Sequence, residues 1–334
     1  MKHITFIFLL FLAPAFAFSQ SANKKKTTQK SLSKYAVQMD KNTKEVISVP
    51  QTEPVTVGNV SKQQIFNTYY SNYLSSEVKN KDFNSLLKAH ELAPANTELY
   101  FELAKFYELE QNNLKKREFC NKLKLTKLSP ALREYANNTL MSVEQGGILV
   151  TYGEDDTYPI WILQLIEGVR KDVKILNYDL MVNETYRKAK TEELGLRFSK
   201  NYSQPIQILK DLATKNKSKN IYYSLTVSHL VLKDLKKDLY PTGLALKYSN
   251  KTFDNSQILS TNWHQKFSKS YISNSLISPQ EKKLNINYVL PLLQLSSFYS
   301  ENGNELKEKE INTVIRKIGL NGGKAQQIES LLKK

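Results

Sequence analysis

The residues of this 334-residue chain best suited to chemistry form a short acidic segment, Glu-Asp-Asp-Thr at 154–157. An apolar run typical of a buried strand precedes the segment, and a run with helical spacing follows it. We expect residues 153–157 to form a loop between the two, at the edge where open α/β sheets bind their ligands. Carboxylate and hydroxyl oxygens there can hydrogen-bond sugar hydroxyl groups or hold a hard divalent cation.

Polar residues also follow the next two predicted strands. Because the carboxyl ends of parallel strands meet at one edge of a sheet, these side chains are predicted to lie near the acidic segment. The alternative is structural: Asp156 or Thr157 caps the helix, Pro159 occupies its first turn, and the remaining acids are solvated. The candidate ligand-binding residues are Glu154, Asp155, Asp156, Thr157, Asn177, Asp179 and Thr226.

Motifs for other chemistry are missing from the sequence. No Gly-rich phosphate loop with its Lys, no G-x-S-x-G and no H-E-x-x-H occurs, and His90, His229 and His264 have no metal-ligand spacing. Adjacent carboxylates point in different directions, whereas glycoside hydrolysis needs two across a cleft. We therefore predict no catalytic residue, no metal site and no cofactor. Cys120 is the one cysteine, which excludes an internal disulfide, and it is predicted to lie in the core.

The elements that position the acidic segment alternate between strand and helix. Apolar runs predict strands at 147–152, 173–176, 221–226 and 243–248, with a helix at 159–170. We therefore expect a small, mainly parallel α/β sheet domain over residues 146–250.

A helical pattern precedes this domain, over residues 61–145. The spacing of Phe66, Tyr69, Tyr70 and Tyr73 recurs 34 residues later, and residues 63–130 resemble the tetratricopeptide repeat, although Tyr70 stands where that repeat prefers a small residue. A further helix at 131–143 would cover the last repeat. The resemblance implies a concave protein-binding surface, with Tyr69, Tyr73 and Tyr107 as candidate partner-binding residues. An unrelated helical bundle is the alternative.

Helices are also predicted for the C-terminal segment, residues 251–334. Ser278, Pro279 and Glu281 form a helix-start signal, and the helix that follows contains Pro291 as a possible kink. Helices at 305–318 and 324–332 would complete a helical hairpin. The predicted fold class is therefore a mixture of α+β and α/β: helical hairpins, a small sheet domain, and a C-terminal helical hairpin.

The N-terminal residues predict export. A basic start, an apolar run at 4–12 and Ala15-Phe16-Ala17 are typical of a signal peptide over residues 1–20. Cys120 is no lipid-anchor site, so we expect a periplasmic or secreted protein that is not a lipoprotein, with no transmembrane span. Residues 21–60 form a Lys-rich linker, predicted to be disordered, that is either a solvated spacer or a contact with anionic lipid or glycan surfaces. The formal charge is +16, but six Arg among 48 basic residues argue against nucleic-acid binding.

One stretch of the chain resembles a known family. Residues 146–180, GGILVTYGEDDTYPIWILQLIEGVRKDVKILNYDL, and the later stretches around 220–222 and 239–243 are similar to the soluble extracytoplasmic region of a bacterial membrane family described as protein O-mannosyltransferase-like. The resemblance spans about 85–330 and implies an extracytoplasmic fold with a possible polar site. That family's transferase activity is attributed to a multi-spanning membrane half, for which this sequence has no counterpart.

Two functions remain open from the sequence. The first is a non-catalytic envelope protein that serves as an accessory module, binding a partner protein through its helical repeats or binding a glycan. The second is a glycan-active enzyme with its site around Asp155, Asp156 and Asn177. The repeats favour the first, because stacked helical hairpins form binding surfaces and supply no chemistry of their own.

Overall fold

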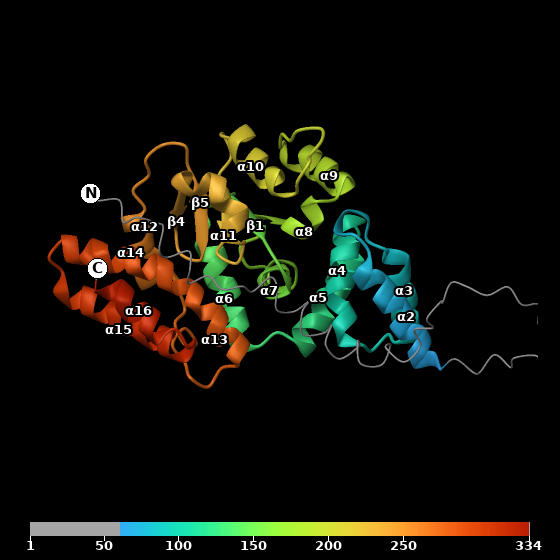
Figure 1. The fold of residues 1–334 in the computed structure, drawn as a ribbon, viewed down its shortest axis with the longest axis horizontal. Coiled ribbons are helices and arrows are strands. Elements are labelled where there is room, and N and C mark those ends of the chain that lie inside the picture. Colours follow the sequence, from blue (N-terminus) through green and yellow to red (C-terminus); the bar gives the residue numbers. More distant parts are fainter. Residues whose placement is uncertain (1–60, 334) are drawn as a thin grey trace, which may run out of the picture.

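The computed structural model describes residues 61–333, so the predicted signal peptide (1–20) and basic linker (21–60) lie outside the described residues. Helical hairpins form one end of the molecule, a sheet with its helices lies in the centre, and C-terminal helices form the other end (Figure 1). This arrangement confirms the predicted mixed fold class. Within residues 61–333, no helix combines the length and apolarity needed to cross a membrane.

The N-terminal part consists of two helical hairpins and a further helix. The hairpins are α2 (Lys62–Ser75) with α3 (Phe83–Leu92), and α4 (Tyr100–Leu109) with α5 (Asn113–Thr126); α6 (Pro130–Met141) follows. Polar side chains fix the helix starts, because Ser61 forms a capping box and Asp82 accepts a hydrogen bond from a free backbone N–H group of α3. The spacing recognised in the sequence buries Phe66 and Tyr73 in the first hairpin and Leu103 and Ala104 in the second.

The central sheet has five strands in the order β2-β1-β3-β5-β4. They are β1 (Ile148–Thr151), β2 (Lys174–Asn177), β3 (Ile221–Ser224), β4 (Leu239–Pro241) and β5 (Ala245–Tyr248). Strand β1 pairs in parallel with β2 and β3, whereas β5 is antiparallel to both β3 and β4. The sheet is therefore mixed: β1, β2, β3 and the unpredicted β4 share one direction, and β5 runs in the opposite direction.

Helix α7 (Glu154–Leu165) corrects the predicted loop at 153–157. Gly153 is its N-cap, at φ +80°, and three acidic residues occupy the first turn, where the helix dipole favours negative charge. The helix therefore begins five residues before the predicted start, and Pro159 lies inside it rather than in its first turn.

Further helices lie around the sheet. No element was predicted between residues 177 and 220, where α8 (Tyr178–Met181), α9 (Glu184–Leu194) and α10 (Ile206–Lys215) form. After β3 come α11 (His229–Leu232) and the 3-10 helix η4 (Lys233–Asp238). Asn177 and Asn183 cap α8 and α9 with their side chains.

The C-terminal part is helical, as predicted. It contains α12 (Ser256–Thr261), α13 (Pro279–Asn285), α14 (Val289–Glu301), α15 (Glu305–Asn321) and α16 (Ala325–Leu332). The predicted start at Ser278 is confirmed as a capping box with Glu281. The helix expected to continue through Pro291 is interrupted just before it: a 3-10 turn at Ile286–Tyr288 separates α13 from α14, and Pro291 lies in the first turn of α14.

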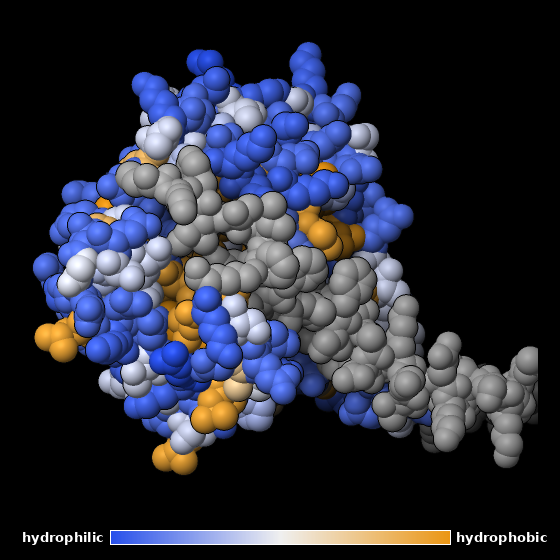
Figure 2. Space-filling view, turned by 60° about the vertical axis from the view of Figure 1, so that its left-hand side comes forward, coloured by the Kyte–Doolittle hydropathy of each residue, from blue (hydrophilic) through white to orange (hydrophobic). Residues whose placement is uncertain are grey.

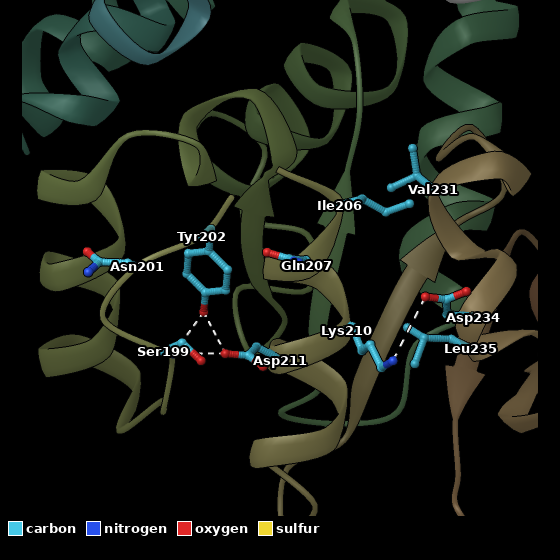
Figure 3. A pocket seen from close by; sticks show the side chains of 10 residues that line it. All are labelled: Ser199, Asn201, Tyr202, Ile206, Gln207, Lys210, Asp211, Val231, Asp234 and Leu235. Atoms are coloured by element: carbon cyan, nitrogen blue, oxygen red, sulfur yellow. Dashed lines mark hydrogen bonds and ion pairs between the residues drawn. The ribbon is translucent and has the colours of Figure 1, made fainter. Parts of the chain in front are cut away.

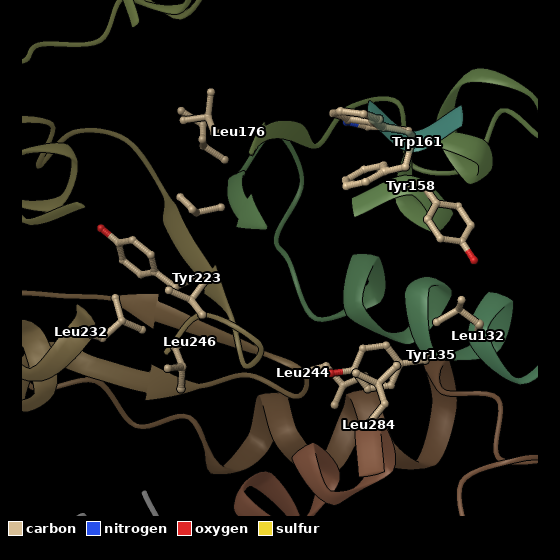
Figure 4. Close-up of a cluster of buried hydrophobic side chains, with 14 of the residues drawn as sticks. Leu132, Tyr135, Tyr158, Trp161, Leu176, Tyr223, Leu232, Leu244, Leu246 and Leu284 are labelled. Atoms are coloured by element: carbon tan, nitrogen blue, oxygen red, sulfur yellow. The ribbon is translucent and has the colours of Figure 1, made fainter. Parts of the chain in front are cut away.

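Strand alternation divides the core between the two sheet faces. Leu149, Tyr222 and Ala245 pack on one face with side chains of α6 and α7. Val150 and Tyr223 belong to a larger cluster, which extends from Phe66 in α2 to Ile328 in α16 and connects all three parts of the molecule. Figure 4 shows the portion of this cluster that includes Tyr223, Trp161 and Leu284. Cys120 is buried in this cluster, as predicted, and burial raises the pKa of its thiol to about 12.

Gly243, in the turn between β4 and β5, has a local role that can be tested. Its φ is +131°, and an added Cβ would lie 2.4 Å from Ser142 Oγ and 2.5 Å from Phe267 Cζ. We expect Gly243→Ala to lower the free energy of unfolding by about 2 kcal/mol through overpacking and backbone strain. Gly303 is the control: its φ is also positive, at +69°, but an added Cβ meets no atom within 4 Å. Urea unfolding of Gly303→Ala should show a loss of about 1 kcal/mol; equal losses would contradict the packing argument.

Candidate functional site

Asp156 is buried at the carboxyl ends of β1 and β3. Its Oδ2 accepts hydrogen bonds from the backbone N–H of Tyr152, at 2.9 Å, and from Thr226 Oγ1, at 2.6 Å. Its Oδ1 accepts from Ser224 Oγ at 2.8 Å. Burial raises the pKa of Asp156 to about 6, although these hydrogen bonds lower it in part. The carboxylate thus joins α7 to two strands.

A second buried group connects α7 to β2. Asn177 Nδ2 donates to Thr157 Oγ1 at 3.0 Å, and Thr157 Oγ1 donates to Thr151 Oγ1, also at 3.0 Å. The Oδ1 of Asn177 accepts from the backbone N–H of Leu180 and so caps α8. The polar atoms that the topology brings to this edge are therefore occupied by one another.

The other two acids of the segment point elsewhere. Glu154 Oε1 lies 2.6 Å from Lys127 Nζ at the end of α5, and Asp155 Oδ2 accepts from Gln280 Nε2 of α13 at 3.0 Å. Burial raises the pKa of Glu154, with its ion pair to Lys127 opposing. Neither Asp156 nor Thr157 is the N-cap, as the structural alternative had expected. The seven candidates are thus divided among separate groups.

Asp179 lies in a different place, in a pocket of about 220 Å³ between α8 and the first two helical hairpins. We call it the junction pocket. Its lining combines apolar side chains near the mouth with a charged interior, and comprises Tyr73, Leu74, Val78, Lys81, Phe83, Glu102, Lys105, Leu109, Asp179, Leu180 and Asn183. It brings together one residue predicted to bind a ligand, Asp179, and one predicted to bind a partner, Tyr73.

Glu102 is the centre of the charged interior. Its Oε2 is 2.7 Å from Lys105 Nζ and also accepts a hydrogen bond from the Tyr73 hydroxyl. Lys81 Nζ donates to the main-chain oxygens of Tyr73, at 3.0 Å, and Ser76, at 3.1 Å, and lies 4.8 Å from the centre of the Tyr73 ring. Two ammonium groups and two carboxylates therefore share the pocket.

The two carboxylates of the junction pocket have opposite pKa shifts. Burial raises the pKa of Asp179, and the nearby Lys105 offsets this only in part. Burial also acts on Glu102, but the charge of Lys105 and the hydrogen bonds from Lys105 and Tyr73 outweigh it and hold its pKa below the usual value. Burial lowers the pKa of Lys81.

The three candidate tyrosines do not form an exposed aromatic groove. Tyr73 is buried, at 1% exposure, whereas Tyr69 and Tyr107 are half-buried. The Tyr69 ring lies 5.2 Å from Lys88 Nζ, and the Tyr107 ring stacks on Phe119 with 5.6 Å between centres. Tyr73 therefore contributes to the wall of the junction pocket.

Lys81, Glu102 and Lys105 were missed in the sequence. The repeat pattern draws attention to apolar positions, so charged residues between them read as a solvated face. A usable signal was the charged pair Glu102 and Lys105, three residues apart and interleaved with the buried Phe101 and Leu103.

Among residues 61–333, no group of three His, Cys, Asp or Glu side chains is arranged to hold a metal ion.

Part of the chain matches the model of a known protein family. Residues 132–190 match the model of a family described as TMEM260-associated domain 2. TMEM260 is an O-mannosyltransferase-like protein, so the match agrees loosely with the resemblance noted in the sequence. The matched region contains β1, α7 and β2, and ends within α9. Neither the curated proteins nor the solved structures include a significant match to this chain.

Proposed function

We propose that the protein is an exported, non-catalytic binding module that holds an uncharged polar group, such as a sugar ring on a glycan or glycosylated partner, in the junction pocket. The pocket itself carries the proposal, because it combines balanced charges with an apolar mouth. The predicted signal peptide supports export to the periplasm or the cell exterior.

The chemistry of the lining favours an uncharged ligand. Lys81 and Lys105 oppose Glu102 and Asp179, so the lining has no net charge to attract an ion. The Lys105 ammonium group as donor and the carboxylates as acceptors match sugar hydroxyl groups, which donate and accept hydrogen bonds. Asp179 makes no hydrogen bond within the described part of the chain that would occupy its carboxylate, so it is available to accept one from a ligand.

The size and rim of the pocket fit a ring-sized group. A volume of about 220 Å³ lies below the range of about 300–1,000 Å³ that drug-sized ligands occupy, and so suits one ring rather than an extended chain. Leu74 and Val78 at the mouth are 49% and 52% exposed, and can pack against the apolar face of a sugar or against a partner protein. The O-mannosyltransferase-like protein associated with the matched family makes mannosides the first probes to test.

Titration of the chain from residue 21 with α-mannobiose, chitobiose and cellobiose tests this proposal. We expect at least one disaccharide to bind and to raise the unfolding midpoint, and Asp179→Asn to weaken its binding by about tenfold, since one charge-assisted hydrogen bond is lost. Asp155→Asn is the matched control: that carboxylate is half-buried outside the pocket and should leave affinity unchanged. Absence of binding by all three sugars, or equal affinity of Asp179→Asn and wild type, would contradict the proposal.

One observation favours glycan hydrolysis as a second candidate. A carboxylate with a raised pKa and another with a lowered pKa line the same pocket, which is how a general acid and its partner base are arranged in glycosidases. In this case the disaccharides would be cleaved, and Glu102→Gln and Asp179→Asn would each abolish product formation. Binding without product after prolonged incubation would leave the binding module as the function.

A further inference from the structure

The positive charge of the folded part is concentrated in one segment. Residues 61–333 contain 39 Lys or Arg and 29 Asp or Glu, a net charge of +10. Residues 197–238 contain nine Lys or Arg, three Asp and no Glu, a net charge of +6. These 42 residues therefore hold most of the excess charge.

This segment folds into one region of the surface, which we call the basic face. It consists of the chain at 197–205, α10, and the α11–η4 stretch after β3; in Figure 1, α10 lies at the top of the molecule beside α9, and α11 lies below α10 near the strands. The upper part of the view in Figure 2 is almost entirely hydrophilic. The exposed basic residues here are Arg197, Lys200, Lys210, Lys215, Lys217, Lys219, Lys233 and Lys237.

A pocket of about 360 Å³ opens in the basic face, between α10 and the α11–η4 stretch (Figure 3). Its wall mixes an aromatic ring, amides, carboxylates and short apolar side chains, which is typical of sites for polar organic ligands. It is lined by Ser199, Asn201, Tyr202, Ile206, Gln207, Lys210, Asp211, Val231, Asp234 and Leu235.

Asp211 organises one wall of this pocket. Its carboxylate is neutralised by its neighbours, so it does not make the pocket negative. Its Oδ2 accepts from the backbone N–H of Ser199 and from the Tyr202 hydroxyl, both at 2.8 Å, and lies 3.0 Å from Lys215 Nζ. Burial acts in the opposite direction, but these contacts lower the pKa of Asp211 to about 2, so the carboxylate stays ionised and neutralised by its neighbours. The wall is thereby held in place without a free negative charge.

The opposite wall presents a more accessible cation. Lys210 is 3.9 Å from Asp234, a loose ion pair between side chains that are 56% and 53% exposed. Exposed pairs of this kind are weak and easily exchanged for another anion. Lys210 can therefore turn to a ligand, with Lys200 and Lys233 exposed nearby in the chain segments that flank the pocket.

We propose that the basic face binds an acidic polysaccharide, with one sugar ring in the pocket of Figure 3 and its carboxylate or phosphate groups paired with the surrounding lysines. The pocket explains recognition of a ring, and the +6 segment explains attraction of a polyanion. This surface is separate from the junction pocket, because the two linings share no residue.

The composition of the basic face argues against nucleic acids and anionic membranes as its ligands. Arg197 is the one arginine in residues 197–238, whereas nucleic-acid sites use Arg forks and free aromatic faces. The Tyr202 ring is the one aromatic ring lining this pocket, and the Arg187 guanidinium lies 5.2 Å from its centre. Leu230 is exposed at 62%, but a single leucine does not form the apolar face that inserts into a membrane.

Binding of polygalacturonate, with uncharged dextran as comparison, tests this proposal on the chain from residue 21. We expect polygalacturonate to bind, dextran not to bind, and the affinity to fall as salt rises. The triple variant Lys200→Ala/Lys210→Ala/Lys233→Ala should bind at least about tenfold more weakly, with a shallower salt dependence. The control triple variant Lys283→Ala/Lys309→Ala/Lys317→Ala removes the same charge from exposed positions on α13 and α15 and should bind like wild type.

A second variant separates the pocket from the charge around it. Val231→Trp fills the pocket without changing charge, and should weaken polygalacturonate binding while leaving disaccharide binding at the junction pocket intact. Equal losses in both lysine triple variants would mean that net charge alone acts, and would overturn the proposal. So would binding of duplex DNA or phosphatidylglycerol vesicles as tight as that of polygalacturonate, or full affinity of Val231→Trp.

Discussion

Replacing Glu108 by alanine is expected to lower the free energy of unfolding by about 3–5 kcal/mol, which urea unfolding would measure. Glu108 is 8% exposed and lies 2.6 Å from Lys116 Nζ and 3.1 Å from Lys190 Nζ. It also accepts a hydrogen bond from the Tyr186 hydroxyl at 3.3 Å. Its removal would leave two largely buried ammonium groups without their anion, which is the costly way to disrupt a buried ion pair.

Glu118 is the control for Glu108. It lies on α5 and pairs with Lys115 at 2.9 Å and Lys122 at 3.0 Å, but its side chain is 42% exposed. Glu118→Ala should therefore cost less than about 1 kcal/mol. The double variant Glu108→Leu/Lys116→Met, which removes Glu108 together with one of its two ammonium partners, should recover part of the loss. Similar losses for Glu108→Ala and Glu118→Ala would show that burial does not decide the strength of these pairs.

The Glu108 network also matters for the proposed function. It joins α4 and α5 to α9, and Lys116 Nζ lies 4.0 Å from the centre of the Trp161 ring of α7. The helical hairpins are thereby attached to the sheet region by ion pairs as well as by apolar packing. Because Glu102 and Lys105 of α4 face Asp179 of α8 across the junction pocket, the same attachment maintains the geometry of that pocket.

Elements with strong local signals were predicted well from the sequence. The start of α13 is encoded by a cap, a proline and an acid within four residues, and β1 is a continuous apolar run. The predicted start of α7 was wrong, because acidic residues that follow a glycine are also typical of a loop. Strand β4 has only three residues, and it is defined by its pairing with β5, which local sequence does not reveal.

The candidate site was predicted only in part, because its contacts depend on tertiary packing rather than on local sequence. The rule that carboxyl ends of parallel strands meet does bring Asp156 to Thr226 and Thr157 to Asn177. That rule cannot show that their polar atoms satisfy one another. The position of Asp179 depends on the short helix α8, and its neighbours Lys81 and Glu102 come from residues about 100 and 80 positions earlier in the chain. Such a pocket depends on tertiary packing of the hairpins on the sheet region.

Asp156→Ala is expected to lower the free energy of unfolding by about 3 kcal/mol in urea unfolding, because three hydrogen-bond donors lose their acceptor.

Comparing wild type with Asp156→Asn as a function of pH isolates the titration of the Asp156 carboxyl group. The pKa of Asp156 is about 6 in the folded protein, above its ordinary value of 3.8, chiefly because of burial, so the folded state binds the proton more tightly than the unfolded chain. The stability contributed by this proton is therefore fully present below 3.8 and is lost as the pH rises through about 6.

Urea unfolding of wild type and Asp156→Asn across that interval tests the argument. The asparagine does not titrate, so the stability of wild type relative to the variant should fall between about pH 4 and pH 6 and level off near pH 7. Other carboxyl groups are common to both proteins, so their titrations cancel in the difference. A difference between wild type and Asp156→Asn that stays constant with pH would mean that Asp156 remains ionised when buried, and that its three donors outweigh the cost of burial.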